Sequence, residues 1–86
     1  MKTFSYTVTS EHGIHGRPAS MLVKTASAFH DSTITLSKGD KSVDAKRIFS
    51  VLSLAAQPHD TITISVTGGD EEAVAQELKT FLEENL

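Results

Sequence analysis

The sequence predicts an α+β fold, in which three helices cover one face of a four-stranded antiparallel sheet. Apolar and polar residues alternate where strands are expected, because successive side chains of a strand point to opposite faces. Elsewhere apolar residues recur at helical intervals. One apolar face per strand favours an antiparallel sheet with helices on that face alone. With 86 residues, the chain is short, and we expect residues 1–86 to form a single domain.

The first strand is expected over residues 4–9, where Phe4, Tyr6 and Val8 alternate with hydroxyl residues. Three further strands are expected at residues 33–37, 41–45 and 61–67. Lys38, Gly39 and Asp40 have the residue types of a turn, and they separate the second strand from the third.

Helices are expected over residues 16–29, 47–55 and 70–85. In the first, Leu22, Ala26 and Phe29 recur at helical intervals. Pro58 is expected to stop the second helix. Asp70 is expected to cap the third, whose first turn carries two glutamates that its positive end favours.

Composition excludes several functions. The chain has no cysteine, which rules out disulfides, thiolate metal sites and cysteine nucleophiles. The chain has no apolar run near the roughly 20 residues of a membrane-spanning helix, so we expect a cytoplasmic protein without membrane insertion. The net charge of −3 argues against nucleic acid as a partner. His12 and His15 have a spacing that could bind a metal on a helix, but Gly13 breaks that geometry, and we expect neither metal nor cofactor.

The residues between the first strand and the first helix carry the chemistry. A helix N-terminus offers unpaired backbone N–H groups and a positive dipole end, which together bind anions. Gly16 and Arg17 would supply such N–H donors. Pro18 has no backbone N–H, but this absence costs little stability in the first turn of a helix. His15 stands at the mouth of this site, where a neutral imidazole could attack phosphorus and the Arg17 guanidinium could hold phosphate oxygens.

These residues, Gly13-Ile14-His15-Gly16-Arg17-Pro18-Ala19, resemble the phosphohistidine signature of the HPr family, the phosphocarriers of the bacterial sugar phosphotransferase system. Chain length, element order and the segment 45–54 are also similar to that family. The resemblance implies an open-faced sandwich and phosphorylation of His15 on Nδ1, assisted by Arg17. It implies enzyme I, charged from phosphoenolpyruvate, as donor and sugar-specific IIA domains as acceptors. Such a protein is a carrier rather than an enzyme, and we expect a monomer.

The resemblance also implies a docking patch for both kinds of partner. Its positions here are Ser20, Met21, Lys24, Arg47, Ile48, Phe49, Leu52 and Ser53. Adjacent Ile48 and Phe49 can hardly both be buried by a short surface helix, which independently indicates an exposed apolar cluster. Arg47 stands where many relatives carry a regulatory serine, so serine-based regulation is not expected.

Two other functions remain open on the sequence alone. The chain could be an HPr paralogue that acts mainly as a phosphorylation-dependent regulator, because the same histidine site would serve. It could also be a small-molecule-binding domain, which would require a concave apolar pocket.

Overall fold

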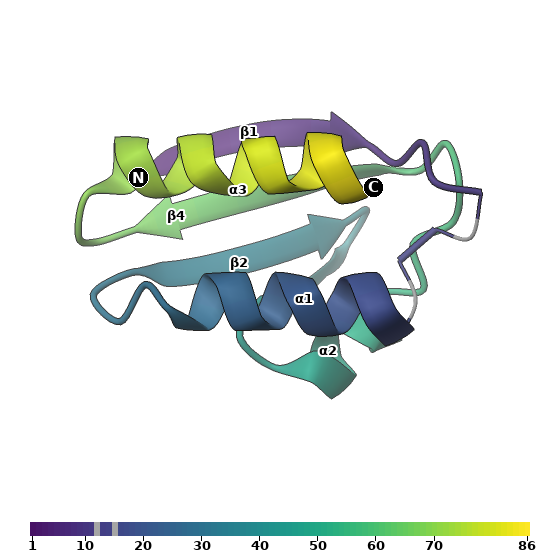
Figure 1. Cartoon of the computed structure of the whole chain (residues 1–86), viewed down its shortest axis with the longest axis horizontal. Helices are drawn as coiled ribbons and strands as arrows, with labels where there is room; N and C mark the ends of the chain where they lie inside the picture. Colours follow the sequence, from purple (N-terminus) through teal and green to yellow (C-terminus); the bar gives the residue numbers. More distant parts are fainter. Residues whose placement is uncertain (12, 15) are drawn as a thin grey trace.

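A computed structural model describes residues 1–11, 13, 14 and 16–86 of the chain. Over these residues the chain forms four strands and three helices, in the order β1 (Lys2–Thr7), α1 (Gly16–Ser27), β2 (Thr33–Lys38), β3 (Lys41–Asp44), α2 (Ile48–Ser53), β4 (Thr61–Thr67) and α3 (Glu71–Asn85). The strands pair as one antiparallel sheet in the order β1-β4-β2-β3. Helices α1 and α3 lie along one face of this sheet, and the short α2 packs beside α1 (Figure 1). The predicted α+β fold is confirmed.

The strand register sorts the side chains into rows that run across the whole sheet. One row faces the helices and is apolar: Phe4, Ile64, Leu36 and Val43. The neighbouring row faces away from the helices and carries hydroxyl groups: Ser5, Thr63, Ser37 and Ser42. Hydroxyl pairs bridge β1 and β4 on this outer face at Thr3–Ser65 (3.4 Å), Ser5–Thr63 (3.3 Å) and Thr7–Thr61 (3.1 Å). The sheet therefore has one apolar face and one polar face, on which hydroxyl side chains predominate and Asp44 of β3 is charged.

The helices bury apolar residues at helical intervals, although Ala73 is exposed and Phe29 and Phe81 are only half-buried. Helix α1 contributes Ala19, Leu22 and Ala26 to the core, and α3 contributes Val74, Ala75, Leu78 and Leu82. Asp70 caps α3 as expected, because its side chain accepts a hydrogen bond from the Ala73 N–H. Burial of these apolar stripes is the main force that holds the helices on the sheet.

Helix α1 ends at Ser27, two residues before the predicted end. The amides of Ala28 and Phe29 donate to carbonyls three residues back, so the chain tightens and leaves the helix. Lys46 then donates through Nζ to the carbonyls of Phe29 (2.8 Å) and Ser32 (2.6 Å). A lysine from a distant part of the chain thus binds carbonyls just beyond the helix.

Helix α2 is shorter than the predicted range 47–55. Arg47 is its N-cap residue with an extended backbone, and Leu54 is its C-cap. The next residue, Ala55, has a φ of +51°, which ends the helix before Pro58 can do so. Among the described residues, the structure contains no helix that is both long and apolar enough to cross a membrane.

Candidate functional site

The predicted site lies where α1 begins. Gly16 is the first residue of α1, Arg17 is exposed at its second position, and Pro18 is half-buried. The amides of this first turn have no partner four residues earlier in the helix, and the dipole end is positive. An added Cβ on Gly16 would meet no described atom within 4 Å, so the backbone here is open to an approaching group. His15 itself, like His12, lies outside the described residues.

The chain on the N-terminal side of His15 is anchored to the loop that follows α2. Ile14 is 5 % exposed, and its N–H donates to the carbonyl of Ala56 over 3.0 Å. Gly13 has a φ of +66°, and a Cβ at this position would lie 2.2 Å from the Ala56 carbonyl oxygen. Only glycine allows the two backbone segments to approach this closely. The residue before His15 is therefore held by a buried side chain and a backbone hydrogen bond.

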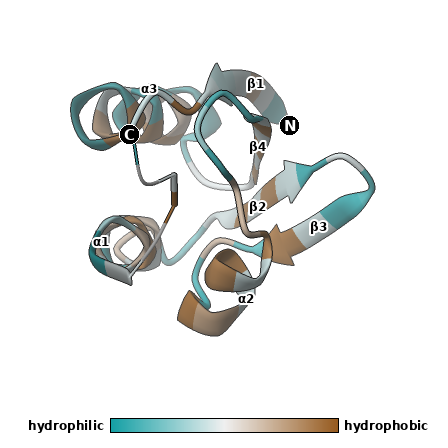
Figure 2. Ribbon diagram, turned by 90° about the vertical axis from the view of Figure 1, so that its right-hand side faces the viewer, coloured by the Kyte–Doolittle hydropathy of each residue, from teal (hydrophilic) through white to brown (hydrophobic). Residues whose placement is uncertain are grey.

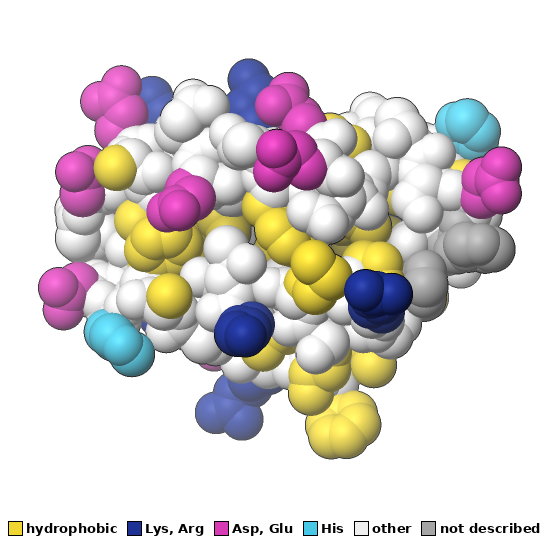
Figure 3. Space-filling view, viewed as in Figure 1, with side chains coloured by type: hydrophobic (Ala, Val, Ile, Leu, Met, Phe, Trp, Pro, Cys, Tyr) yellow, Lys and Arg dark blue, Asp and Glu magenta, His cyan; other side chains and the backbone are white. Residues whose placement is uncertain are grey.

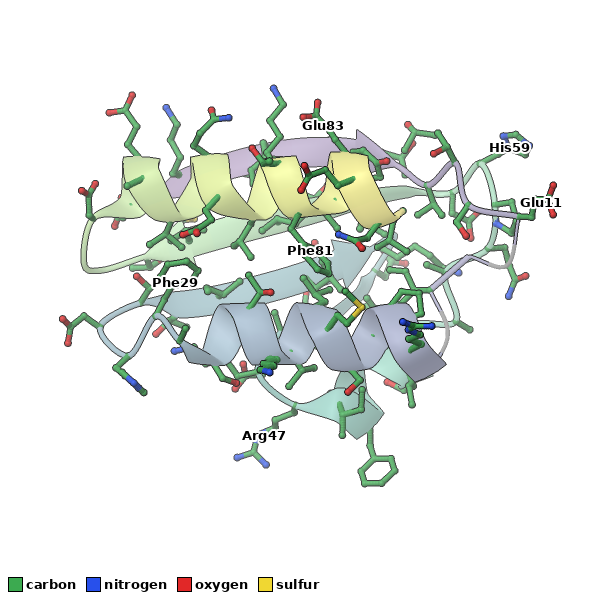
Figure 4. All side chains as sticks on the ribbon, in the orientation of Figure 1. Glu11, Phe29, Arg47, His59, Phe81 and Glu83 are labelled. Atoms are coloured by element: carbon green, nitrogen blue, oxygen red, sulfur yellow. The ribbon has the colours of Figure 1, made fainter. Side chains whose placement is uncertain are left out.

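A second contact fixes the start of the same segment. The amides of Thr9 (2.6 Å) and Ser10 (2.7 Å) both donate to the carbonyl oxygen of Leu86, and so does the Thr9 hydroxyl (2.9 Å). The Gly13 amide in turn donates to the Ser10 carbonyl over 3.1 Å. Residues far apart in sequence thus converge at one end of the sheet. In Figure 4, Glu11 and His59 lie at this end, near the start of α1.

The predicted docking residues come together on α1 and α2, which pack against each other. Phe49 is 83 % exposed and Met21 is 40 % exposed, while Ile48 and Leu52 are half-buried. We call these four residues the apolar patch. The polar residues of the predicted docking surface are all exposed: Ser20, Lys24, Arg47 and Ser53. Figure 2 shows the hydrophobic residues of α2 at the edge of the molecule beside α1.

Charges are segregated between the helices. Helix α1 contains Arg17 and Lys24 and no carboxylate, whereas α3 contains five glutamates and one lysine. Figure 3 shows acidic side chains gathered around α3, and cationic and hydrophobic side chains together around α1 and α2. Arg47 extends away from the start of α2 (Figure 4), with its Nε 3.8 Å from the Asp44 carboxylate. The face that carries the apolar patch is therefore cationic.

A cavity of about 330 Å³ lies at the other end of the molecule. It opens between the end of α1 and the start of α3 and is lined by residues including Phe29, Asp31, Asp70 and Glu77. Its volume is at the lower limit for a ligand pocket, roughly 300–1,000 Å³. This cavity is remote from Gly16, so it does not form part of the predicted site. In the described part of the chain, no three histidine, aspartate or glutamate side chains are grouped so that they could hold a metal ion.

The Ala56 carbonyl and the loop around it support this site, and neither could be predicted from the sequence. The contact joins Ile14 to a residue 42 positions later, and no periodicity indicates such a pairing. The only local signal was the turn chemistry of Pro58 and Asp60.

The sheet with its helices, the open start of α1 and the exposed apolar patch agree with the phosphocarrier class that the sequence led us to expect. The family described as the PTS HPr component phosphorylation site matches residues 2–84 of the chain. The chain belongs to this HPr family and is a phosphocarrier domain.

Solved HPr structures from bacteria agree with this membership. An HPr from Thermoanaerobacter tengcongensis is 34% identical with a TM-score of 0.92, covering 99% of this chain and 94% of that one. A histidine-containing phosphocarrier protein from Mycoplasma is 35% identical with a TM-score of 0.91, over 96% and 93%. An HPr from Bacillus anthracis is 32% identical with a TM-score of 0.87, over 94% and 95%.

Two of the similar structures are described as dimers. Crh of Bacillus subtilis, 31% identical with a TM-score of 0.77, is described as a swapped, intertwined dimer. A second HPr structure from Thermoanaerobacter tengcongensis is also a dimer.

Proposed function

We propose that the chain accepts a phosphoryl group from enzyme I on His15 and passes it to sugar-specific IIA domains. The observation that carries this proposal is the open N-terminus of α1, which begins directly after His15 in a chain of the HPr family. In this relay a new bond forms between the imidazole nitrogen and phosphorus while the bond from phosphorus to the donor breaks. The reverse exchange at the acceptor returns His15 to its free form.

The start of α1 supplies what phosphoryl transfer requires from the protein, which is mainly positioning and neutralisation of charge. The backbone amides of Gly16 and Arg17 can bind phosphate oxygens without bringing a negative side chain near them. The Arg17 guanidinium can add charge-assisted hydrogen bonds to the same oxygens. Pro18 fixes the backbone of the first turn, which limits the ordering needed when phosphate arrives.

The apolar patch and its cationic surroundings support docking to partner proteins. Phe49 is a large apolar side chain that is 83 % exposed. An exposed apolar cluster of this kind typically marks an interaction surface. Lys24 and Arg47 would attract acidic partner surfaces and increase the rate of encounter. An Arg47→Glu variant should therefore react more slowly with enzyme I at low salt; an unchanged rate would count against this role of Arg47.

Incubation with enzyme I, magnesium and phosphoenolpyruvate, followed by intact mass measurement, tests the proposal. We expect one added phosphoryl group that mild acid removes, since phosphohistidine is acid-labile and phosphoserine is not. His15→Ala should fold normally and remain unlabelled, whereas Arg17→Gly should be labelled but transfer more slowly to a IIA domain. An HPr of known activity shows that enzyme I is active; labelling of His15→Ala, or no labelling of the wild type, would refute the proposal.

A second candidate function is regulation through the phosphorylated form, because the chain is also similar to Crh, a protein described as belonging to catabolite repression. Transfer to IIA domains distinguishes the two functions, since a regulator would be labelled on His15 without delivering the group efficiently. We propose that the carrier acts as a monomer in the cytoplasm, and light scattering at working concentration tests its mass.

A further inference from the structure

The loop after α2 has a backbone shape that its residues would not adopt alone. Ala55 has a φ of +51° and His59 a φ of +74°. A left-handed backbone is unfavourable for a residue with a Cβ, because the Cβ comes too close to the following carbonyl oxygen. Both residues are exposed, so packing of their own side chains does not compensate this cost. Other contacts must hold residues 54–60 in this shape.

Asp60 makes the contacts that close the loop. Its Oδ2 accepts hydrogen bonds from the Gln57 N–H (2.8 Å) and from the Lys38 ammonium (3.3 Å), and its own N–H donates to the Gln57 carbonyl (3.0 Å). Lys38 also donates to the Ala55 carbonyl over 3.2 Å. The Gln57 N–H and the Lys38 ammonium hold the pKa of Asp60 below its ordinary value, as expected for a carboxylate engaged in its charged form.

The shape of this loop determines where the Ala56 carbonyl points. Ala56 lies between the two residues that Asp60 and Lys38 hold, and its carbonyl accepts the Ile14 N–H. The backbone of the loop also pairs with Val8. The Asp60 carbonyl accepts the Val8 N–H (2.9 Å), and the His59 N–H donates to the Val8 carbonyl (2.8 Å). Asp60 therefore links the loop to both ends of the segment 8–14 that leads to His15.

We propose that Asp60, together with Lys38, is a positioning residue for phosphoryl transfer. It touches neither phosphate nor partner; it fixes the Ala56 carbonyl, which fixes Ile14 and hence the backbone from which His15 extends. This inference rests on the proposed function of His15. None of the residues that carry it belongs to the apolar patch or to the first turn of α1.

Glu71 provides a matched control at the opposite end of the molecule. Its carboxylate also accepts a backbone N–H from three residues earlier, that of Gly68 (2.7 Å), and pairs with an ammonium group, that of Met1 (2.9 Å). These contacts likewise lower its pKa. Asp60→Ala and Glu71→Ala thus remove the same kind of interaction, but only Asp60 is connected to residues 13 and 14.

Two measurements on both variants test the inference. In phosphorylation by enzyme I, Asp60→Ala should lower kcat by about tenfold and change KM less than twofold, because small displacements of a reacting group reduce rates strongly while the apolar patch is intact. Amide hydrogen exchange at Ile14 should be faster in Asp60→Ala. Glu71→Ala should show wild-type kcat and wild-type exchange at Ile14. Asp60→Asn keeps an acceptor for the Gln57 N–H, so its kcat and its exchange rate at Ile14 should lie between those of Asp60→Ala and the wild type.

The outcomes separate this inference from the proposed function. Wild-type kcat in Asp60→Ala, or an equal loss in Glu71→Ala, would overturn the inference while leaving phosphorylation of His15 established. Unchanged exchange at Ile14 in Asp60→Ala would overturn it without reference to any phosphoryl transfer. If Asp60→Ala does not fold, the same two readouts on Asp60→Asn decide: a loss of kcat with faster exchange at Ile14 supports the inference, and wild-type values refute it. Failure of the wild type to accept phosphate would refute the proposed function instead.

Discussion

Replacement of Gly13 by alanine should destabilise the fold through one close backbone contact. The new Cβ would lie 2.2 Å from the Ala56 carbonyl oxygen and 3.0 Å from the Cα of Gln57. Real Cβ atoms essentially never approach another heavy atom within 3.0 Å. The segment must therefore move by about 0.8 Å, the difference between this limit and the 2.2 Å to the Ala56 oxygen. The atom in the way is backbone, which cannot rotate aside as a flexible side chain can. The hydrogen bond from Ile14 to Ala56 would then be lengthened or lost.

The expected cost follows from two contributions. The φ of +66° adds roughly 1–2 kcal/mol for a residue with a Cβ. Loss of the Ile14–Ala56 hydrogen bond adds about 1 kcal/mol, since that is a typical net value for such a bond. A total of about 2–3 kcal/mol is a large part of the roughly 4–13 kcal/mol expected for a domain of this size.

Urea unfolding of three alanine variants separates these contributions. Gly39 has a φ of +60° and no described atom within 4 Å of an added Cβ, so Gly39→Ala should cost only the backbone strain. Gly16 has neither problem, and Gly16→Ala should be neutral or slightly stabilising at the start of α1. If Gly13→Ala costs no more than Gly39→Ala at an unchanged m-value, the contact with Ala56 does not constrain this segment, and the reasoning is wrong.

Three further predictions concern other parts of the molecule. Phe49→Ala should change stability by less than about 0.5 kcal/mol because the side chain is mostly exposed, yet raise the KM for enzyme I; a clear loss of stability in urea would contradict its exposure. Arg47→Ser should raise Tm by several degrees, since Arg47 is the N-cap of α2 and makes no side-chain cap bond in the described structure, whereas serine caps are worth about 1 kcal/mol. A lower Tm would show that its ion pair with Asp44 matters more. The depressed pKa values of Asp60 and Glu71 contribute stability above their unfolded-state pKa, and this stability is lost as pH falls through the folded values. The urea midpoint should therefore fall on acidification, and less steeply in Asp60→Asn and Glu71→Gln.

Periodicity in the sequence was sufficient to predict the layers of the fold. Strict alternation in residues 61–67 predicted β4 with its bounds, because the strand buries Ile62, Ile64 and Val66 and exposes or half-exposes the rest. The Asp70 cap was also predictable, since capping depends on residue types a few positions apart. These features are local, so one stretch of sequence contains all the information they need.

Helix ends and the support of the site depend on contacts between distant residues and could not be predicted in the same way. Lys46 binds carbonyls that follow α1, although nothing near Phe29 in the sequence indicates it. Ala55 takes a left-handed backbone that alanine does not favour locally, and the surrounding loop imposes it. The choice of His15 and Arg17 rested on residue types and resemblance, and both remain predictions until phosphorylation is measured.

The hydroxyl face of the sheet has a consequence for the order of events in the proposed relay. Its threonine and serine side chains pair with one another between β1 and β4, so their hydroxyl groups are already engaged within the sheet. The apolar patch and the basic residues of α1 lie on the side of α1 and α2. Donor and acceptor would then compete for the same side, and no ternary complex could form with the carrier between them. The relay would then follow ping-pong kinetics, in which the donor leaves before the acceptor binds.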